Sequence, residues 1–362
     1  MSNLTFLRVE DQETRERYQS LVSQSAYGSI FQDTSWLTLY KTIPGVLGGF
    51  QCMVLKGDNV LLSVQVVIYD LPLHLHWAYV PMGPIFYTTD LPERAHALQF
   101  CIDELKKSLQ RISTVFMRFE YPYEDHVVLP NLPSLRIAHT EYRPQHTIVV
   151  DLTRSSEEIF AQMKQKGRYN IKVAERHLVI MEKWEKKEDG WYVDGALSKS
   201  TADPVKVFQD LLNETAERDK FSVHGKRYHD AFFYSLTDSA FLLLAKYQGR
   251  YCAGGIFSVS TGGKAVYHYG ASTYASRHVM APYKVQWEAM LEAKRRGAIE
   301  YDFLGIAPDE NPLHPLHGVT EFKKKFGGRE RVYAPSKEYV LQPLWYFLIR
   351  AIKKIRGVIR RK

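Results

Sequence analysis

The sequence predicts an α+β protein built from two copies of one domain plan, and three observations lead to this fold class. The chain has 362 residues, which is longer than a single hydrophobic core usually grows. Hydrophobic residues make up 45% of the chain and aromatic residues 13%, which is enough for packed cores. The third observation is that one order of helices and strands occurs twice along the chain.

The first copy begins with one or two short helices within residues 13–42, where Asp33 is a candidate N-cap. Three strand-like runs follow, FQCMVLK, VLLSVQVVIY and LHLHWAYV, separated by turn residues. The next run, LPERAHALQFCIDELKKSLQR, has helical spacing, because four apolar residues recur on one side: Leu98, Ile102, Leu105 and Leu109. The strand TVFMRFEYP completes this copy.

The second copy repeats the order after residue 203. Asp203 is the expected cap of the helix DPVKVFQDLLNETAERD, with Pro204 at its first position. The runs AFLLLAKY, RYCAGGIFSVS and KAVYHYGAS are expected strands. The helix APYKVQWEAMLEAKRRG then precedes the strand IEYDFLGIAP, and each copy's second helix contains a glutamine followed by an aromatic residue. We therefore expect two related α+β domains.

The formal net charge is +8, and residues 164–187 and 323–362 hold most of the surplus lysine and arginine. This surplus predicts a polyanionic partner, which is a nucleic acid, a phosphorylated ligand or an anionic membrane surface. Four cations recur at every fourth residue and would share one helical stripe: Lys164, Arg168, Lys172 and Arg176. Either the stripe is a solvated face, or an anion or an acidic protein surface neutralises it. Gly167 lies inside the run and weakens the prediction of a helix.

The C-terminal segment PLWYFLIRAIKKIRGVIRRK predicts a basic amphipathic helix. Its apolar residues fall on one face: Leu344, Leu348, Ile352, Ile355 and Ile359. This helix is expected to bind the inner face of the cytoplasmic membrane or to dock on the N-terminal domain. Both can hold, with one turn of the helix docked and another on the membrane. We find no signal peptide, no apolar run of about 20 residues and no close cysteine pair, so we expect a cytoplasmic protein.

Most familiar catalytic signatures are absent from the sequence. We find no nucleophile elbow, no phosphate-binding Walker loop, no dinucleotide fingerprint and no zinc-binding helix motif. His74 with His76, and His314 with His317, have no thiol or carboxylate set nearby. We expect neither a metal ion nor a cofactor.

Four segments then become recognisable: KGRYNIKVAERHLV, YGAS…MAPYKVQWEAMLEAKRRG, YDFLGI and EFKKKFGG. In this order, over about residues 20–335, they resemble the FemABX family of peptidoglycan bridge-forming aminoacyltransferases. The resemblance implies two tandem GNAT-like domains, residues 1–150 with 336–362 and residues 151–335. It implies no coiled-coil arm, because residues 177–320 leave no room for one.

The activity that the resemblance implies is non-ribosomal peptidyl transfer. An amino acid moves from aminoacyl-tRNA to the position-3 amine of the stem peptide in UDP-MurNAc-pentapeptide or lipid II. We expect a monomer whose partners are this donor, this acceptor and the inner membrane surface.

The resemblance places the catalytic cation at Lys323, in the second domain. Aminoacyl transfer from an ester to an amine passes through a tetrahedral oxyanion, and one fixed donor there contributes on the order of 2.7–4 kcal/mol. Phe322 and Phe326 are expected to hold this segment as a strand, while Lys324 and Lys325 contact tRNA phosphate, as do Lys164, Arg168 and Lys172. The alternative for Lys323 is a surface lysine on an edge strand.

The resemblance also implies substrate-binding residues in both domains. Phe322, Tyr228 and Tyr283 are expected at the acceptor site. Glu120, at the end of a first-domain strand, is expected to orient or deprotonate the attacking amine. The alternative for Glu120 is a cap on the turn EYPYED.

Two phosphate-binding positions of the family fit this sequence less well. The family arginine aligns with His224, with Arg227 close behind, and the family lysine falls on Tyr40, one residue before Lys41. These departures and the basic tail favour a lipid-linked acceptor over the UDP-linked one.

Two other functions stay open at this point. One is an acetyl-CoA-dependent GNAT N-acyltransferase, although the sequence has no glycine-rich loop that opens a helix and cradles pyrophosphate. The other is a non-catalytic tRNA-binding protein, which the charge would suit. The sequence does not indicate which amino acid is donated, how many are added or which diamino acid the stem carries.

Overall fold

The computed structural model describes residues 4–359 apart from residues 126 and 128, and it describes side chains as far as Ile352. The chain divides into two compact units. Unit 1 consists of Met1–Tyr142 together with Tyr333–Lys362, and unit 2 consists of Arg143–Val332. The fold is α+β, with one mixed sheet in each unit.

The sheet of unit 1 has the strand order β1-β2-β3-β4-β6-β17-β7, with β5 paired to β3. Its strands are β1 (Leu4–Arg8), β2 (Val46–Lys56), β3 (Asn59–Leu71), β4 (Leu75–Val80), β5 (Ile85–Phe86), β6 (Thr114–Phe119), β7 (Leu135–Ile137) and β17 (Lys337–Val340). All pairs are antiparallel except β4 with β6. Strand β17 comes from the C-terminal segment and lies inside the sheet, between β6 and β7.

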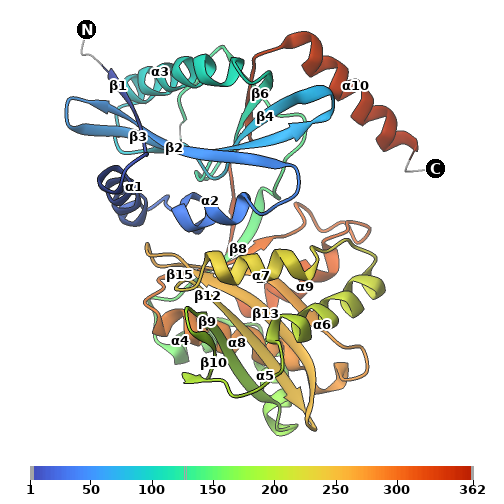
Figure 1. Ribbon diagram of the computed structural model, residues 1–362. Helices are drawn as coiled ribbons and strands as arrows, with labels where there is room; N and C mark the ends of the chain where they lie inside the picture. Colours follow the sequence, from blue (N-terminus) through green and yellow to red (C-terminus); the bar gives the residue numbers. More distant parts are fainter. Residues whose placement is uncertain (1–3, 126, 128, 360–362) are drawn as a thin grey trace. The chain divides into compact units, whose positions relative to one another are not determined.

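Helices cover both faces of this sheet (Figure 1). They are α1 (Gln12–Gln24), α2 (Thr34–Tyr40), α3 (Leu91–Gln110) and α10 (Pro343–Ile359). The predicted apolar side of α3 is confirmed, since Leu98, Ile102, Leu105 and Leu109 are all buried in the core of the unit. The side chain of Asp33 caps α2 by accepting from the backbone N–H of Ser35, as predicted.

The sheet of unit 2 has the strand order β11-β10-β9-β12-β13-β14-β15-β8-β16. Its strands are β8 (His146–Asp151), β9 (Ile180–Lys187), β10 (Gly190–Val193), β11 (Ala196–Leu197), β12 (Ala240–Tyr247), β13 (Arg250–Val259), β14 (Lys264–Ser272), β15 (Glu300–Gly305) and β16 (Arg329–Val332). Again one pair is parallel, β14 with β15.

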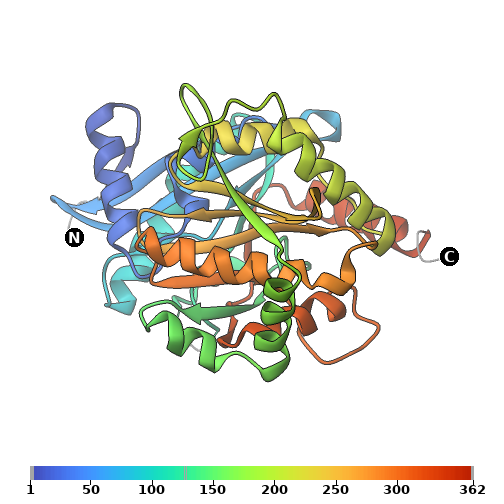
Figure 2. The ribbon, with the colours of Figure 1, turned by 90° about the horizontal axis from the view of Figure 1, so that it is seen from below.

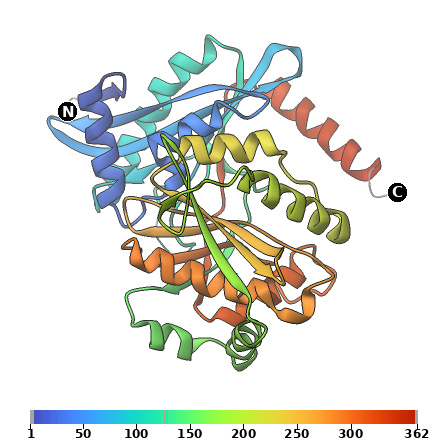
Figure 3. The same cartoon turned by 60° about the horizontal axis from the view of Figure 1, so that its bottom comes forward.

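The helices of unit 2 lie on both faces of its sheet, with α6 and α7 on one side and α8 on the other (Figures 2 and 3). They are α4 (Ser156–Gln162), α5 (Gln165–Arg176), α6 (Pro204–Asp219), α7 (Lys226–Ser235), α8 (Ala281–Arg295) and α9 (His317–Lys323). The predicted cap of α6 is confirmed, because the Asp203 side chain accepts from the N–H groups of Val205 and Lys206.

The predicted repetition is visible in the two sheets. In unit 1 the antiparallel strands β2, β3 and β4 lead through α3 to β6, which pairs with β4 in parallel. In unit 2 the strands β12, β13 and β14 lead through α8 to β15, which pairs with β14 in parallel. A parallel pair needs a crossover, and in both units a long helix provides it.

Candidate functional site

Lys323 lies at the end of a short helix and not on a strand. Helix α9 ends at Lys323 and continues into the 3₁₀ turn η4 (Lys324–Phe326). The expected strand was wrong because Phe322 and Phe326 are four residues apart, which is the spacing of one helical turn. Their rings lie 5.1 Å apart, and both pack against the ring of Tyr283 on α8.

The ammonium group of Lys323 is buried and held by two backbone carbonyls. The side chain is 6% exposed, and Nζ donates to the carbonyl oxygens of Leu304, at 3.0 Å, and Gly305, at 2.7 Å. Burial lowers the pKa of Lys323 to about 8, while the nearby carboxylate of Asp302 acts to raise this pKa. Lys323 is therefore not a surface lysine, and it still carries its charge near pH 7.

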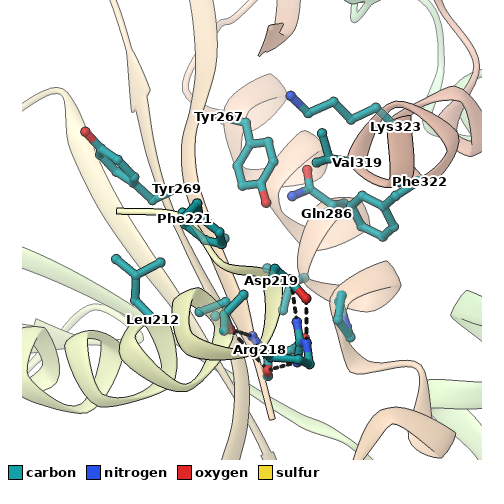
Figure 4. Close-up of a pocket in the computed structure, with 18 of the residues that line it drawn as sticks. Leu212, Arg218, Asp219, Phe221, Tyr267, Tyr269, Gln286, Val319, Phe322 and Lys323 are labelled. Atoms are coloured by element: carbon teal, nitrogen blue, oxygen red, sulfur yellow. Dashed lines mark hydrogen bonds and ion pairs between the residues drawn. The ribbon is translucent and has the colours of Figure 1, made fainter. Parts of the chain in front are cut away.

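Lys323 lines a cavity of about 840 Å³ that belongs entirely to unit 2 (Figure 4). The cavity lies where β14 and β15 separate, because these strands pair only from Lys264–Val266 to Glu300–Asp302. The start of α8, the end of α6 and the segment before η4 complete its wall. A concave space of this size fits a small organic group and is typical of ligand sites.

The wall of the cavity is mostly aromatic and apolar, with a positive charge balance. Its cationic side chains are those of Arg218, Lys220, Arg277 and Lys323, and its one carboxylate is that of Asp219. Arg218 donates through Nε and one terminal nitrogen to this carboxylate, at 2.9 Å each. The wall as described therefore favours a neutral or anionic ligand over a cation.

Polar groups deeper in the wall are neutral. Burial lowers the pKa of His268 to about 3, so its imidazole is uncharged, and it lies 2.8 Å from the hydroxyl of Ser258. Burial raises the pKa of the Tyr267 hydroxyl well above its usual value. The carboxamide of Gln286 accepts a hydrogen bond from the Tyr301 hydroxyl at 2.7 Å.

Helix α5 packs against the backbone of η4, the turn that follows Lys323, and Gly167 makes this possible. A Cβ at Gly167 would lie 2.3 Å from the carbonyl oxygen of Lys325, which is inside van der Waals contact. The same carbonyl accepts from the backbone N–H of Lys164 at 3.1 Å. Gly167 therefore does not break the helix, contrary to the argument from sequence, and its missing side chain is what allows the close approach.

The predicted phosphate-contacting cations have different surroundings. Lys164 and Lys172 are exposed, Lys164 at the N-cap of α5 and Lys172 on the helix itself. Arg168 instead donates to the backbone carbonyls of Ala161 and Met163 at the end of α4. Both hydrogen bonds come from one terminal nitrogen of the guanidinium, and the phosphate contact expected of Arg168 stays a prediction.

Lys324 and Lys325 also have protein partners. Lys324 lies 3.6 Å from the carboxylate of Glu310 and 3.9 Å from that of Glu321, which are loose ion pairs. Nζ of Lys325 donates to the hydroxyl of Tyr283 at 3.1 Å. Lys325 thus contributes to the position of Tyr283 as well as adding charge.

Among the predicted acceptor-site residues of unit 2, Phe322 and Tyr283 line the cavity with Lys323. Tyr228 lies beside the wall, since the hydroxyl of the wall residue Tyr269 is 3.4 Å from its own. The ring of His224 stacks on Tyr228 with centroids 4.1 Å apart, and burial lowers the pKa of His224. Arg227 is exposed on α7 and is not among the cavity-lining residues described.

The remaining two predicted site residues belong to unit 1. Glu120 follows β6 directly, is 8% exposed, and its carboxylate accepts a hydrogen bond from the Tyr79 hydroxyl. Lys41 is exposed at the C-terminal end of α2. The buried position of Glu120 argues against a simple solvent-facing cap on the following turn.

Sequence reasoning missed several residues that build the site. Tyr267 and the carbonyls of Leu304 and Gly305 gave no signal, because they lie in stretches that read as ordinary strands. Asp302 was part of the recognised segment YDFLGI but had no assigned role. Gln286 was noted only as a repeated feature of the two long helices.

The two units together define a tandem GNAT-like fold. A tandem GNAT protein from the clavulanic acid biosynthesis pathway matches with a TM-score of 0.54 and 11% identity, over 94% of this chain and 99% of that chain. The crystal structure of FemX matches with a TM-score of 0.79 and 18% identity, over the same shares of the two chains. At these identities the likeness shows the fold.

The sequence shows the family. Residues 134–250 and 247–354 match the FemAB family, which together is more than half of the chain, so this protein belongs to the FemAB family. It is 22% identical to a lipid II:glycine glycyltransferase of Staphylococcus haemolyticus over 94% of both chains. It is 24% identical to a UDP-N-acetylmuramoylpentapeptide-lysine N(6)-alanyltransferase of Weissella viridescens over 83% of this chain and 86% of that protein.

These comparisons confirm the resemblance and the fold class expected from the sequence. Among the residues that the structure describes, none of the helices has the length and hydropathy needed to cross a membrane.

Proposed function

We propose that this protein is an aminoacyltransferase of peptidoglycan precursor synthesis. It transfers an amino acid from aminoacyl-tRNA to the position-3 amine of the stem peptide, preferring lipid II over UDP-MurNAc-pentapeptide as acceptor. The relatives named above act on these two acceptors, which supports the acceptor class. No cofactor takes part, because the ester of the donor is already activated.

The observation that carries this proposal is the buried ammonium of Lys323 on the wall of the unit 2 cavity. Two of its N–H groups are bound by the carbonyls of Leu304 and Gly305. An ammonium has three N–H donors, so one remains for a ligand in the cavity. A fixed donor in a desolvated site is worth far more to a developing negative charge than the same donor in water.

In the reaction, the acceptor amine attacks the ester carbonyl, and a C–N bond forms while the carbonyl oxygen becomes an oxyanion. The Lys323 ammonium stabilises this oxyanion and then the ribose oxygen that leaves as the C–O bond breaks. The amine loses one proton and the ribose hydroxyl gains one, so the proton count balances. Glu120 keeps its proposed role of orienting or deprotonating the amine.

The donor tRNA would bind through the positive surface of unit 2. Lys164, Lys172 and Arg176 are exposed along α5, whose N-terminal turn contacts the segment that carries Lys323. Contacts of this kind with phosphates carry no sequence information but supply affinity that falls with salt. We therefore assign these three side chains to the tRNA backbone.

The lipid-linked acceptor is supported by helix α10 of unit 1. One side of this helix is docked: Tyr346 is 2% exposed, packs against Phe116 and donates from its hydroxyl to Glu338. The other side presents four exposed apolar residues, which are Leu344, Phe347, Leu348 and Ile352. The helix thus docks on its own domain and still leaves an apolar face uncovered.

We propose that the uncovered face of α10 rests on an anionic lipid bilayer. Arg350 borders this face, and the sequence adds lysine or arginine at 353, 354, 356 and 360–362. Ile355, Ile359 and these basic side chains lie outside the described side chains, so the structural argument stands on residues 343–352. An apolar face bordered by cations is the pattern of a helix that lies in the plane of an anionic membrane surface.

Transfer is tested with purified protein, radiolabelled aminoacyl-tRNA and the two acceptors. Lys323→Met should lower the rate about 100-fold to 1000-fold, the loss expected for one oxyanion donor. Lys199→Met, in a loop on the same unit, is the control for removing a lysine. A Lys323→Met protein that is folded and fully active would refute the proposal.

Membrane binding is tested by sedimentation with vesicles of phosphatidylcholine, alone or with phosphatidylglycerol. The double variant Leu344→Glu and Leu348→Glu should lose binding to the anionic vesicles, whereas Leu197→Glu, at an exposed leucine of β11, should bind like the parent chain. Point variants are needed because truncation before Tyr346 would remove a buried core residue. Equal binding of all three proteins would refute the membrane role of α10.

An acetyl-CoA-dependent acyltransferase is separated from this proposal by direct binding. Acetyl-CoA that binds at micromolar concentration and acylates an amine without tRNA would favour that alternative. Salt-sensitive tRNA binding with no transfer would favour a tRNA-binding protein.

A further inference from the structure

The carbonyls that hold Lys323 are presented by an irregular end of β15. The pairing of β15 with β8 shifts its register between Asp302 and Gly305, so this end of β15 departs from the regular ladder. Leu304 has φ +54°, in the left-handed region that a leucine rarely adopts. Such a bulge re-aims backbone groups, and here the carbonyls of Leu304 and Gly305 turn to Nζ of Lys323.

The side chain of Asp302 stabilises this left-handed turn. Its Oδ1 accepts from the backbone N–H of Leu304 at 2.7 Å and from the hydroxyl of Thr147 on β8. An aspartate that binds the N–H two residues further on mimics a backbone turn, which offsets the conformational strain at Leu304. Asp302 is 8% exposed, so both hydrogen bonds are shielded from water.

Gly305 is fitted to the same turn. A Cβ at Gly305 would lie 2.4 Å from Cγ of Pro144, so a larger residue would push the bulge away from its place. The bulge is therefore set from both sides, by the Asp302 carboxylate and by the contact with Pro144.

We propose that Asp302 is a positioning residue of the transfer reaction, which acts through Lys323. It holds the turn whose two carbonyls fix the ammonium, and its negative charge keeps that ammonium protonated in a site that excludes water. The inference rests on the proposed role of Lys323, but one of its tests below does not depend on transfer.

The other titratable groups around Lys323 leave Asp302 as the compensating charge. Tyr267 of β14 is neutral, because burial raises its pKa well above the usual value. Tyr283 of α8 receives the hydrogen bond of Lys325. On the segment of Lys323 itself, Glu321 lies against Lys324. Desolvation lowers the pKa of Lys323, and the charge of Asp302 is the effect that opposes this lowering.

Two substitutions separate the geometric role from the electrostatic one. Asp302→Asn keeps an oxygen that can accept from Leu304 and Thr147 but removes the charge. Thr147→Val removes one hydrogen bond to Asp302 and keeps the charge. If Asp302 acts as proposed, Asn at 302 lowers the pKa of Lys323 by about one pH unit, the lower end of the effect of an adjacent opposite charge. Val at 147 leaves this pKa in place.

The first test measures the titration of Lys323 directly, by NMR of Nζ in protein labelled with ¹⁵N-lysine, with Lys323→Arg as the assignment control. The parent chain should titrate near pH 8 and Asp302→Asn at lower pH. This measurement needs no donor or acceptor, so it stands even if the proposed function fails.

The second test follows kcat/KM against pH. The logarithm of kcat/KM should rise with pH at slope one, because more of the acceptor amine is unprotonated. It should flatten near pH 8, because Lys323 then loses its own proton. In Asp302→Asn the break should move to lower pH, and in a Lys323→Arg background no break near pH 8 should appear, with or without the substitution at Asp302. A Lys323 titration that is unchanged in Asp302→Asn, whatever the transfer rate, would overturn the proposal.

Discussion

Replacement of Lys323 by methionine should change the unfolding free energy of the protein by an amount that depends on pH. In the folded protein the pKa of Lys323 is lowered by burial from 10.5 to about 8. Below pH 8 both the folded and the unfolded chain carry the proton, and the folded chain bears the full cost of the buried charge. At about 1.4 kcal/mol per pH unit, this cost is about 3 kcal/mol at pH 7.

The cost should disappear as the pH rises. Between pH 8 and 10.5 the unfolded chain binds more protons than the folded one, so the stability contributed by this group rises with pH. From pH 7 to pH 10 the parent chain should gain about 2.5 kcal/mol in unfolding free energy relative to Lys323→Met. At pH 7 the variant should be about as stable as the parent, because the relieved charge cost is offset by two carbonyls that lose a donor, at about 1–3 kcal/mol each.

The assay is urea unfolding followed by tryptophan fluorescence at pH 7 and pH 10, for the parent chain and Lys323→Met. Other groups that titrate in this range are common to both proteins, so the difference between the two proteins isolates Lys323. Lys199→Met is the matched control. A difference in unfolding free energy that is the same at both pH values would refute the reasoning, because Lys323 would then not be held as a desolvated cation.

Three further predictions concern the surroundings of the site and the assembly of unit 1. Gly167→Ala should lower the transfer rate and cost about 1–3 kcal/mol of stability, because the added Cβ would collide with the backbone carbonyl of Lys325. The control Gly225→Ala should change little, since an added Cβ there meets no other atom. Urea unfolding and transfer rates check both variants. Glu338→Gln should cost about 3 kcal/mol in thermal unfolding, because it breaks a buried ion pair with an arginine; an unchanged melting temperature would contradict this. Lys172→Gln should weaken tRNA binding and reduce by about one the slope of log K for tRNA binding against log salt concentration. Filter binding at several salt concentrations measures this slope, and a variant with the parent slope would remove Lys172 from the interface.

The repeated order of elements could be predicted from sequence because the signals are local. The apolar side of α3 follows from a spacing of three and four residues, and the cap of α6 follows from Asp203 and Pro204. Strand β17 could not be found in this way, because its four residues, KEYV, gain their place by pairing with β6 and β7, which lie about 200 residues earlier.

The candidate site also has residues that could be predicted from the sequence and residues that could not. Lys323 was reached through the resemblance to a family, and its burial on a cavity wall supports the role assigned to it. The two carbonyls of Leu304 and Gly305 that bind Lys323 were missed, because a bulge at a strand end has the same amino-acid composition as the strand. Gly167 weakened the prediction of a helix because Lys325, whose backbone needs the missing side chain, lies elsewhere in the sequence.

The inner place of β17 has a consequence for how the protein is made on the ribosome. While residues up to about 335 are being synthesised, β6 presents an unsatisfied row of backbone groups on the side that β17 will later occupy. The middle portion of the chain can finish folding during translation, whereas the earlier portion must wait until its last strand emerges. A nascent chain stalled before residue 337 should therefore be the aggregation-prone species, and a peptide of residues 333–352 supplied in trans would be the natural rescue.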